Sequence, residues 1–334
     1  MGAILVVSKT PTSQLTEPMY ANNFNPWSRL NQFVTSAGLE QQFLFAPLYG
    51  LGDRAAFYAY LEAFGATHRA NLSVVCVSGT PDPVAELFPF LRSRMVVVPK
   101  DLLMGPLELT HWVYGSPKPT SGQLFFTWHW AAGDGSSAQY SEKNCAKNPA
   151  LTHKTLIKEI LGLSMDVRPS ALRADLVSPS ITVGRSKKIM LCPSSNTIAA
   201  PDTPWWIDLA LRLQALSFEP VFNVSMAASA QTAQGRAVGA ISYDAFPNFD
   251  GPISSFLKEV TGYRGVIAAR SGMCELLALA ASVPYAVVSK KPITEFWRLG
   301  EGFGAPPEAT VHLEGNDPQV AAITIENISK RWLI

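Results

Sequence analysis

The sequence predicts an α/β protein made of two doubly wound domains, each a parallel sheet covered by helices on both faces. Short apolar runs without polar–apolar alternation recur along the chain and are typical of strands buried on both faces. Segments of helical character separate these runs, which indicates βαβ units with parallel strands. With 334 residues the chain is long enough for two domains, each of about 150 residues.

The first half alternates predicted strands with predicted helices. Apolar runs at the N-terminus and at the start of 42–57 predict its first two strands, and a glycine-rich turn follows the second of them. The alternation then continues to residue 163. Further strands are predicted over 72–78, 95–99 and 123–130, and helices over 54–67, 83–91, 102–114 and 150–163.

The segment 168–186 separates the two halves. It contains two prolines and several serines with little periodicity, and it is therefore the predicted linker between domains 1–167 and 187–334. A helix over 204–216 is expected to have Thr203 as its cap and Pro204 at its first position. Two such domains facing each other across a cleft would share one ligand site. Strands are predicted over 187–193, 220–224, 265–269 and 285–289, and further helices over 253–261, 273–282 and 317–330.

Composition and charge exclude several classes of function. Lys and Arg number 27 against 26 Asp and Glu, so the net charge of +1 gives no reason to expect nucleic acid as a partner. The five histidines show no metal-ligand spacing, and no metal is expected. We expect neither a signal peptide nor a transmembrane helix. Four widely spaced cysteines without a CxxC pair fit a reduced, cytosolic compartment: Cys76, Cys145, Cys192 and Cys274.

The turn from Gly50 to Asp53 is the most informative motif of the first half. A turn between a strand and a helix lies at the carboxyl edge of a parallel sheet, where α/β proteins bind ligands. Asp53 could accept a proton from a substrate hydroxyl there, but Asp is also a favoured N-cap residue, and both roles are compatible. Gly50, Gly52 and Arg54 are expected to line the same cleft.

Two turns of the second half are candidate ligand loops. The polar residues Ser194, Ser195 and Asn196 follow a predicted strand and could hold a diphosphate, or they could form an ordinary connection. The loop lacks the glycines and lysine of a Walker A motif, which disfavours ATP hydrolysis.

The second candidate loop is Arg270-Ser271-Gly272. Gly272 allows close approach of the backbone, and the amides at the start of the following helix favour an anion. Arg270 could add a positive fork suited to phosphate, and Glu275 could accept sugar hydroxyls. The alternative is that Arg270 is a surface residue and Glu275 complements the helix dipole.

Aromatic residues offer weaker signals. Trp128, Trp130, Trp205 and Trp206 could form platforms for a sugar or a base, although core packing explains them more simply. His129 lies between two tryptophans near a strand end and could point into the cleft, or it could be a structural histidine.

The layout of the chain resembles the GT-B glycosyltransferases, and within them the heptosyltransferase-like family nine. In that family an early strand ends in a Gly-Asp turn, which Gly52-Asp53 matches here, and a late strand, turn and helix bind the donor nucleotide, which 265–277 match. Three departures are visible, and one is that Ala269-Arg270-Ser271 stands where the family usually has a Thr or Asp-rich approach. This chain has Glu275 where the family usually has a histidine, and a longer segment precedes its Gly-Asp turn.

The resemblance implies a glycosyltransferase that moves a sugar from a nucleotide-sugar donor to an acceptor hydroxyl. Asp53 would be the catalytic base of an inverting, metal-independent reaction without a cofactor, the first domain would take a glycan or glycolipid acceptor, and the second would bind the donor. The implied role is bacterial cell-surface polysaccharide or lipopolysaccharide synthesis in the cytoplasm, with peripheral association at the inner face of the plasma membrane as an option. A nucleotide-sugar epimerase of the same fold and a non-catalytic nucleotide- or sugar-binding protein are the alternatives.

Overall fold

The computed structural model of the chain divides into two compact units, 1–170 and 171–334. Their boundary falls within the predicted linker 168–186. A short helix of that segment, α6 (Ala174–Val177), belongs to the second unit and packs on its helix α9 (Ile253–Val260). The structure describes residues 5–6, 32–46, 50–76, 80–98, 121–122, 124–126, 152–177, 186–195, 200–225, 243, 245–280, 283–290, 310–314 and 317–331.

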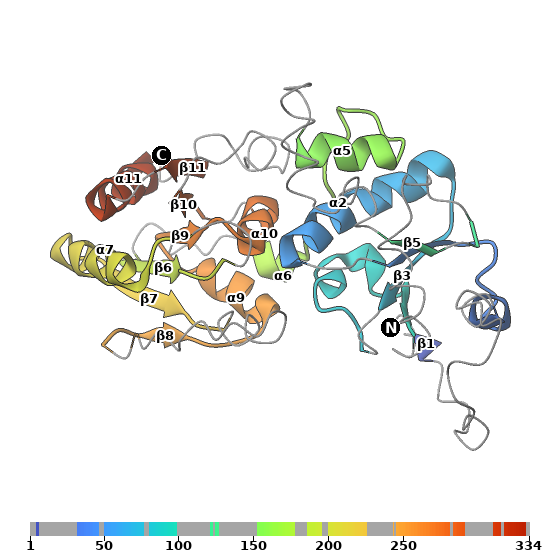
Figure 1. The fold of residues 1–334 in the computed structure, drawn as a ribbon, viewed down its shortest axis with the longest axis horizontal. Helices are drawn as coiled ribbons and strands as arrows, with labels where there is room; N and C mark the ends of the chain where they lie inside the picture. The colour runs from blue at the N-terminus through green and yellow to red at the C-terminus, as the bar shows by residue number, and fades with distance from the viewer. Residues whose placement is uncertain are drawn as a thin grey trace, which may run out of the picture. The chain divides into compact units, whose positions relative to one another are not determined.

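The first unit contains a five-stranded parallel sheet in the order β1-β4-β3-β2-β5, and Figure 1 labels β1, β3 and β5 of it beside helix α2. The chain runs outward from β2 to β3 and β4, and β5 then lies on the other side of β2. The sheet is therefore doubly wound, and its direction reverses between β2 and β5. The strands are β1 (Leu5–Val6), β2 (Phe43–Ala46), β3 (Leu72–Cys76), β4 (Met95–Val97) and β5 (Leu124–Phe126), and the main helices are α2 (Leu51–His68) and α5 (His153–Ile160).

One predicted helix of this unit is wrong in type. Residues 83–91 form two short 3-10 helices, η2 (Ala85–Leu87) and η3 (Pro89–Leu91), in place of one α-helix. Pro89 lacks the backbone N–H that an α-helix needs and disfavours helical dihedrals at Phe88, which has extended backbone (φ −102°, ψ 114°). The predicted helix 102–114 lies outside the described residues.

The second unit contains a six-stranded parallel sheet in the order β11-β10-β9-β6-β7-β8. Read from β8, this is the doubly wound order 3-2-1-4-5-6, so the direction of the chain reverses between β6 and β9. The prediction of two doubly wound α/β halves is thus confirmed. The strands are β6 (Lys188–Cys192), β7 (Glu219–Asn223), β8 (Asn248–Phe249), β9 (Gly265–Ala269), β10 (Tyr285–Ser289) and β11 (Thr310–Glu314), and the other helices are α7 (Thr203–Ala215), α10 (Gly272–Ala280) and α11 (Pro318–Arg331).

The core of the second unit explains two of the tryptophans. Trp205 and Trp206 of α7 are buried in a cluster with residues of β6, β9 and α11, and Trp206 Nε1 donates a hydrogen bond to the Pro201 carbonyl at 3.2 Å. The packing interpretation is confirmed for both, whereas Trp128 and Trp130 lie outside the described residues. The expected Thr203 cap is off by one residue, because Asp202 accepts from Trp205 N at 3.3 Å.

The three described cysteines, Cys76, Cys192 and Cys274, are free and buried. Burial raises the pKa of the Cys76 and Cys274 thiols to about 11, so both stay protonated at neutral pH. They pack as small hydrophobic residues.

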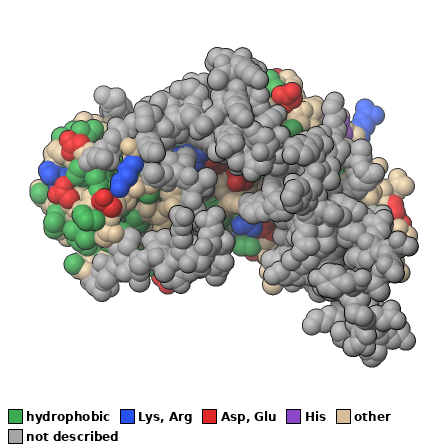
Figure 2. Space-filling model, viewed as in Figure 1, with side chains coloured by type: hydrophobic (Ala, Val, Ile, Leu, Met, Phe, Trp, Pro, Cys, Tyr) green, Lys and Arg blue, Asp and Glu red, His purple; other side chains and the backbone are tan. Residues whose placement is uncertain are grey.

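The surface of α7 and α11 carries hydrophobic side chains among charged ones (Figure 2). Among the side chains of these two helices that the structure describes, Leu211, Val320 and Ile323 are the large exposed apolar ones. Within the described part of the chain, no helix combines the length and apolar character needed to cross a membrane.

Candidate functional site

The two candidate ligand loops of the second unit lie at the reversal point of its sheet. β6 and β9 are direct neighbours, with Cys192 opposite Ala268. Ser194 and Ser195 follow the end of β6, and the turn that begins at Arg270 follows the end of β9. In open α/β sheets, ligands bind outside the carboxyl ends of the strands at this point.

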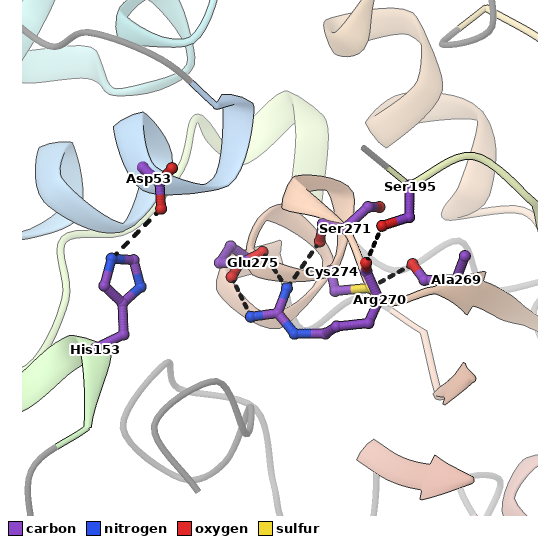
Figure 3. A network of polar contacts seen from close by, with 8 residues as sticks. All are labelled: Asp53, His153, Ser195, Ala269, Arg270, Ser271, Cys274 and Glu275. Carbon is purple, nitrogen blue, oxygen red and sulfur yellow. Dashed lines mark hydrogen bonds and ion pairs between the residues drawn. The ribbon is translucent and has the colours of Figure 1, made fainter. Parts of the chain in front are cut away.

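A hydrogen bond joins these two loops (Figure 3). Ser195 Oγ donates to the carbonyl oxygen of Arg270 at 2.5 Å. The two serines are only partly buried, whereas Asn196, the third predicted residue of the loop, lies outside the described residues. The connection means that the first loop helps to fix the position of the second.

Arg270 and Glu275 form a buried ion pair with each other. The guanidinium donates through Nη1 to Glu275 Oε2 at 3.0 Å and through Nη2 to Oε1 at 2.5 Å, and the two side chains are only 4% and 3% exposed. Nη1 also donates to the Ser271 carbonyl at 3.0 Å. The reading of Arg270 as a surface residue is therefore wrong, and the positive fork predicted for phosphate is occupied by Glu275 (Figure 3).

The start of α10 retains features suited to an anion. Gly272 is the first residue of the helix, where backbone N–H groups have no partner within the helix and the dipole favours negative charge. The Ser271 hydroxyl is buried beside the Cys274 thiol and makes no hydrogen bond to an oxygen or nitrogen of the described residues. A buried hydroxyl without an oxygen or nitrogen partner is uncommon, and the Ser271 hydroxyl is therefore a candidate ligand contact.

The hydrogen bond between the loops gives a first prediction. We expect Ser195→Ala to lower the free energy of unfolding by about 1 kcal/mol, because the Arg270 carbonyl loses its donor. Ser194→Ala, the adjacent control, is expected to stay within about 0.5 kcal/mol of the parent protein. Urea unfolding of the two variants measures both values, and equal effects would show that the bond contributes nothing.

In the first unit, Asp53 does not cap its helix. α2 begins at Leu51, Gly50 is the N-cap residue without a side-chain cap, and Asp53 lies in the first turn. The N-cap interpretation is thus wrong because the helix starts earlier than predicted. The carboxylate folds back over the glycine, since a Cβ on Gly50 would lie 2.7 Å from Asp53 Oδ2. A side chain at position 50 would require the Asp53 carboxylate to move, and Gly52 is buried within α2.

A histidine that the sequence analysis did not single out faces Asp53. His153 Nε2 lies 3.5 Å from Asp53 Oδ1, with the imidazole 4% and the carboxylate 40% exposed (Figure 3). His153 is the first residue of α5, and Thr152 and Thr155 form a capping box around this helix start. The capping pattern could have located the helix start, but nothing in the sequence connects it to α2.

Arg54 turns away from the Asp53 carboxylate and pairs with a buried aspartate. Arg54 Nη1 donates to Asp82 Oδ1 at 2.8 Å, and the Tyr58 hydroxyl donates to Asp82 Oδ2 at 2.6 Å. Asp82 also accepts from Val84 N at 2.9 Å. Burial, followed by the charge of Asp82, raises the pKa of Tyr58 well above its usual value. This network anchors α2 to the segment after β3, and Asp82 was not predicted from the sequence.

Two further expectations concern His129 and the presence of a metal site. His129, the last of the predicted cleft residues, lies outside the described residues. Within the described ranges, no three His, Cys, Asp or Glu side chains form a group that could hold a metal ion.

Comparison with known proteins rests on structure. No protein-family model matches the sequence, and no curated protein matches it. The iron-containing dodecameric glycosyltransferase TibC from enterotoxigenic E. coli H10407 has a TM-score of 0.55 at 13% identity, over 89% of this chain and 78% of TibC. The E. coli ADP-heptose lps heptosyltransferase II has a TM-score of 0.51 at 12% identity, over 88% of this chain and 100% of the other. The chain has the GT-B fold.

This likeness confirms the resemblance on which the sequence analysis relied. It spans both units of the chain, and both similar structures are glycosyltransferases. At these identities the GT-B likeness establishes the fold, whereas a fold alone does not fix an activity. The activity has to be argued from the residues of the site.

Proposed function

We propose that this protein is a glycosyltransferase that moves a sugar from a nucleotide-sugar donor to an acceptor hydroxyl. The observation that carries the proposal is the partly exposed Asp53 carboxylate, which follows β2 at the reversal point of the first sheet in a chain of GT-B fold. A base in this position suits the deprotonation of an acceptor, and the reversal point of the second sheet suits a nucleotide.

Each unit then has a defined chemical task. Asp53 accepts the proton of the acceptor hydroxyl while the anomeric carbon forms its bond to that oxygen and loses the nucleoside diphosphate. The backbone amides of Ser271 and Gly272, the α10 dipole and the hydroxyl of Ser271 stabilise the leaving diphosphate, whereas Ser195 holds the turn through its bond to the Arg270 carbonyl. Arg270 and Glu275 contribute through the turn that their ion pair holds. We infer an inverting reaction, because Asp53 acts as a single base.

The proposed pathway, location and acceptor rest on the similar structures. One of them is an ADP-heptose lipopolysaccharide transferase, and we infer a related role in bacterial cell-surface polysaccharide or lipopolysaccharide synthesis, in the cytoplasm, with a glycan or glycolipid acceptor. Peripheral binding to the inner face of the plasma membrane would bring the enzyme to such an acceptor. We also infer that no metal or cofactor is needed, since helix amides and hydroxyls can stabilise the diphosphate.

A thermal-shift screen with ADP, UDP, GDP and their glucose or mannose conjugates tests donor binding. A ligand that binds the native state at about 100 times its Kd adds about 2.7 kcal/mol of stability, and one base is expected to raise the Tm more than the others. Gly272→Asp places a like charge at the proposed diphosphate contact and should abolish the shift. If no nucleotide changes the Tm of the parent protein, the donor site is not where we propose it.

The two alternatives predict different products. An epimerase needs a second acid–base group that reaches the sugar, and His153, which lies 3.5 Å from Asp53, is almost fully buried. A binding protein would release nothing. Free nucleoside diphosphate, formed only when donor and acceptor are both present, distinguishes transfer from both alternatives.

A further inference from the structure

We propose that His153 is a positioning residue that holds the Asp53 carboxylate in the orientation needed to accept a proton. The proposal rests on the proposed function, since it concerns the base of that reaction. His153 and Asp53 belong to the same unit of the chain, and their side chains approach from two different helices, α5 and α2.

The two oxygens of the carboxylate lie beside different residues. Oδ1 lies 3.5 Å from His153 Nε2. Oδ2 lies over Gly50, so close that a Cβ there would be only 2.7 Å away. A carboxylate that is 40% exposed can change rotamer, and the neighbouring His153 restricts this change at Oδ1, whereas Gly50, which has no side chain, leaves room for Oδ2.

The imidazole itself is firmly held. Its side chain is 4% exposed, and the first turn of α5 is fixed by two hydrogen bonds between Thr152 and Thr155, at 2.7 and 3.3 Å. Further along, α5 contacts α2 again through Lys158, whose Nζ lies 5.3 Å from the centre of the Tyr60 ring. A buried side chain on a fixed helix can restrict the orientation of an exposed carboxylate beside it.

A second histidine joins the same two regions and provides a matched control. His68, in the last turn of α2, has its Nε2 2.9 Å from the Leu161 carbonyl just after α5, and its ring packs against Phe64 with 4.6 Å between centroids. It lies at the opposite end of α2 from Asp53. A purely structural role in joining α5 to α2 is therefore common to both histidines, whereas contact with Asp53 belongs to His153.

The first test does not depend on activity. In protein labelled with ¹³Cγ-aspartate, the Asp53 carboxyl resonance is assigned by its loss in Asp53→Asn. We expect His153→Leu to move this resonance and His68→Leu to leave it in place. His153→Gln, which keeps an N–H group in the same region, should move it less and serves if the leucine variant does not fold. An unmoved Asp53 resonance in both His153 variants would overturn the proposal.

The second test separates positioning from packing by kinetics. Nucleoside diphosphate release is followed, with a lipopolysaccharide-derived acceptor present, from whichever of ADP-glucose, UDP-glucose and GDP-mannose stabilises the protein. We expect His153→Leu to lower kcat about 10- to 100-fold with an unchanged KM for the donor. His153→Gln should recover part of the lost kcat, and His68→Leu should have the kcat of the parent protein. Equal kcat in His153→Leu overturns the inference. If the parent protein itself releases no diphosphate, the transferase proposal fails, and the carboxyl resonance alone decides the role of His153.

Discussion

Asp53→Asn is expected to lower sugar transfer by about 10²- to 10⁴-fold, because a carboxamide cannot accept the proton of the acceptor hydroxyl. The side chain keeps its size, so the fold and the packing of α2 should be preserved. Donor binding should also be preserved, because the proposed donor contacts lie in the other unit. The expected pattern is therefore a loss of kcat with an unchanged Kd for the nucleoside diphosphate.

Glu62→Gln is the matched control for this variant. Glu62 is an exposed carboxylate of the same helix, and its replacement makes the same chemical change away from the β2–α2 turn. We expect transfer by Glu62→Gln to equal that of the parent protein, measured as diphosphate released with a lipopolysaccharide-derived acceptor. Asp53 would be removed from the mechanism if its variant behaved like the Glu62 control.

Glu275→Gln is expected to destabilise the second unit by about 3–5 kcal/mol, because it removes the negative charge that pairs with the buried Arg270 guanidinium. Urea unfolding measures the change. The double variant Arg270→Met/Glu275→Leu removes both charges and should recover most of the loss, since apolar residues often replace a buried ion pair without cost. A Glu275→Gln protein as stable as the parent would show that the pair does not hold this turn.

The exposed pair of Arg173 and Asp175 serves as the control for this variant. The two side chains are 29% and 55% exposed, with Arg173 Nη2 2.7 Å from Asp175 Oδ2. Solvent screens such a pair, so Asp175→Asn should leave the unfolding midpoint unchanged. The contrast between the two pairs isolates the effect of burial.

The strands and the loops at their carboxyl ends could be predicted because local patterns specify them. Apolar runs such as β6 and β9, each followed by a turn with glycine or polar residues, indicate parallel strands and their carboxyl ends without any knowledge of tertiary contacts. Both loops beside β6 and β9 were found in this way. The segment before residue 42 was also expected to contain a strand, and it supplies the edge strand β1.

Long-range pairing could not be predicted in the same way. His153 reaches Asp53 because α5 packs on α2, and Asp82 reaches Arg54 across 28 residues; no local pattern encodes either contact. The pairing of Arg270 with Glu275 was missed for a different reason. Both residues were selected as ligand contacts because each charge suits a nucleotide, and only the tertiary burial shows that they satisfy each other.

The position of a bound nucleoside diphosphate tests the central claim most directly. We would determine a crystal structure of the chain with the nucleoside diphosphate that raises its Tm most. The account predicts diphosphate oxygens within hydrogen-bond distance of the Ser271 and Gly272 amides, between the carboxyl ends of β6 and β9. A nucleotide bound away from this turn, or the absence of binding by every nucleoside diphosphate, would contradict it.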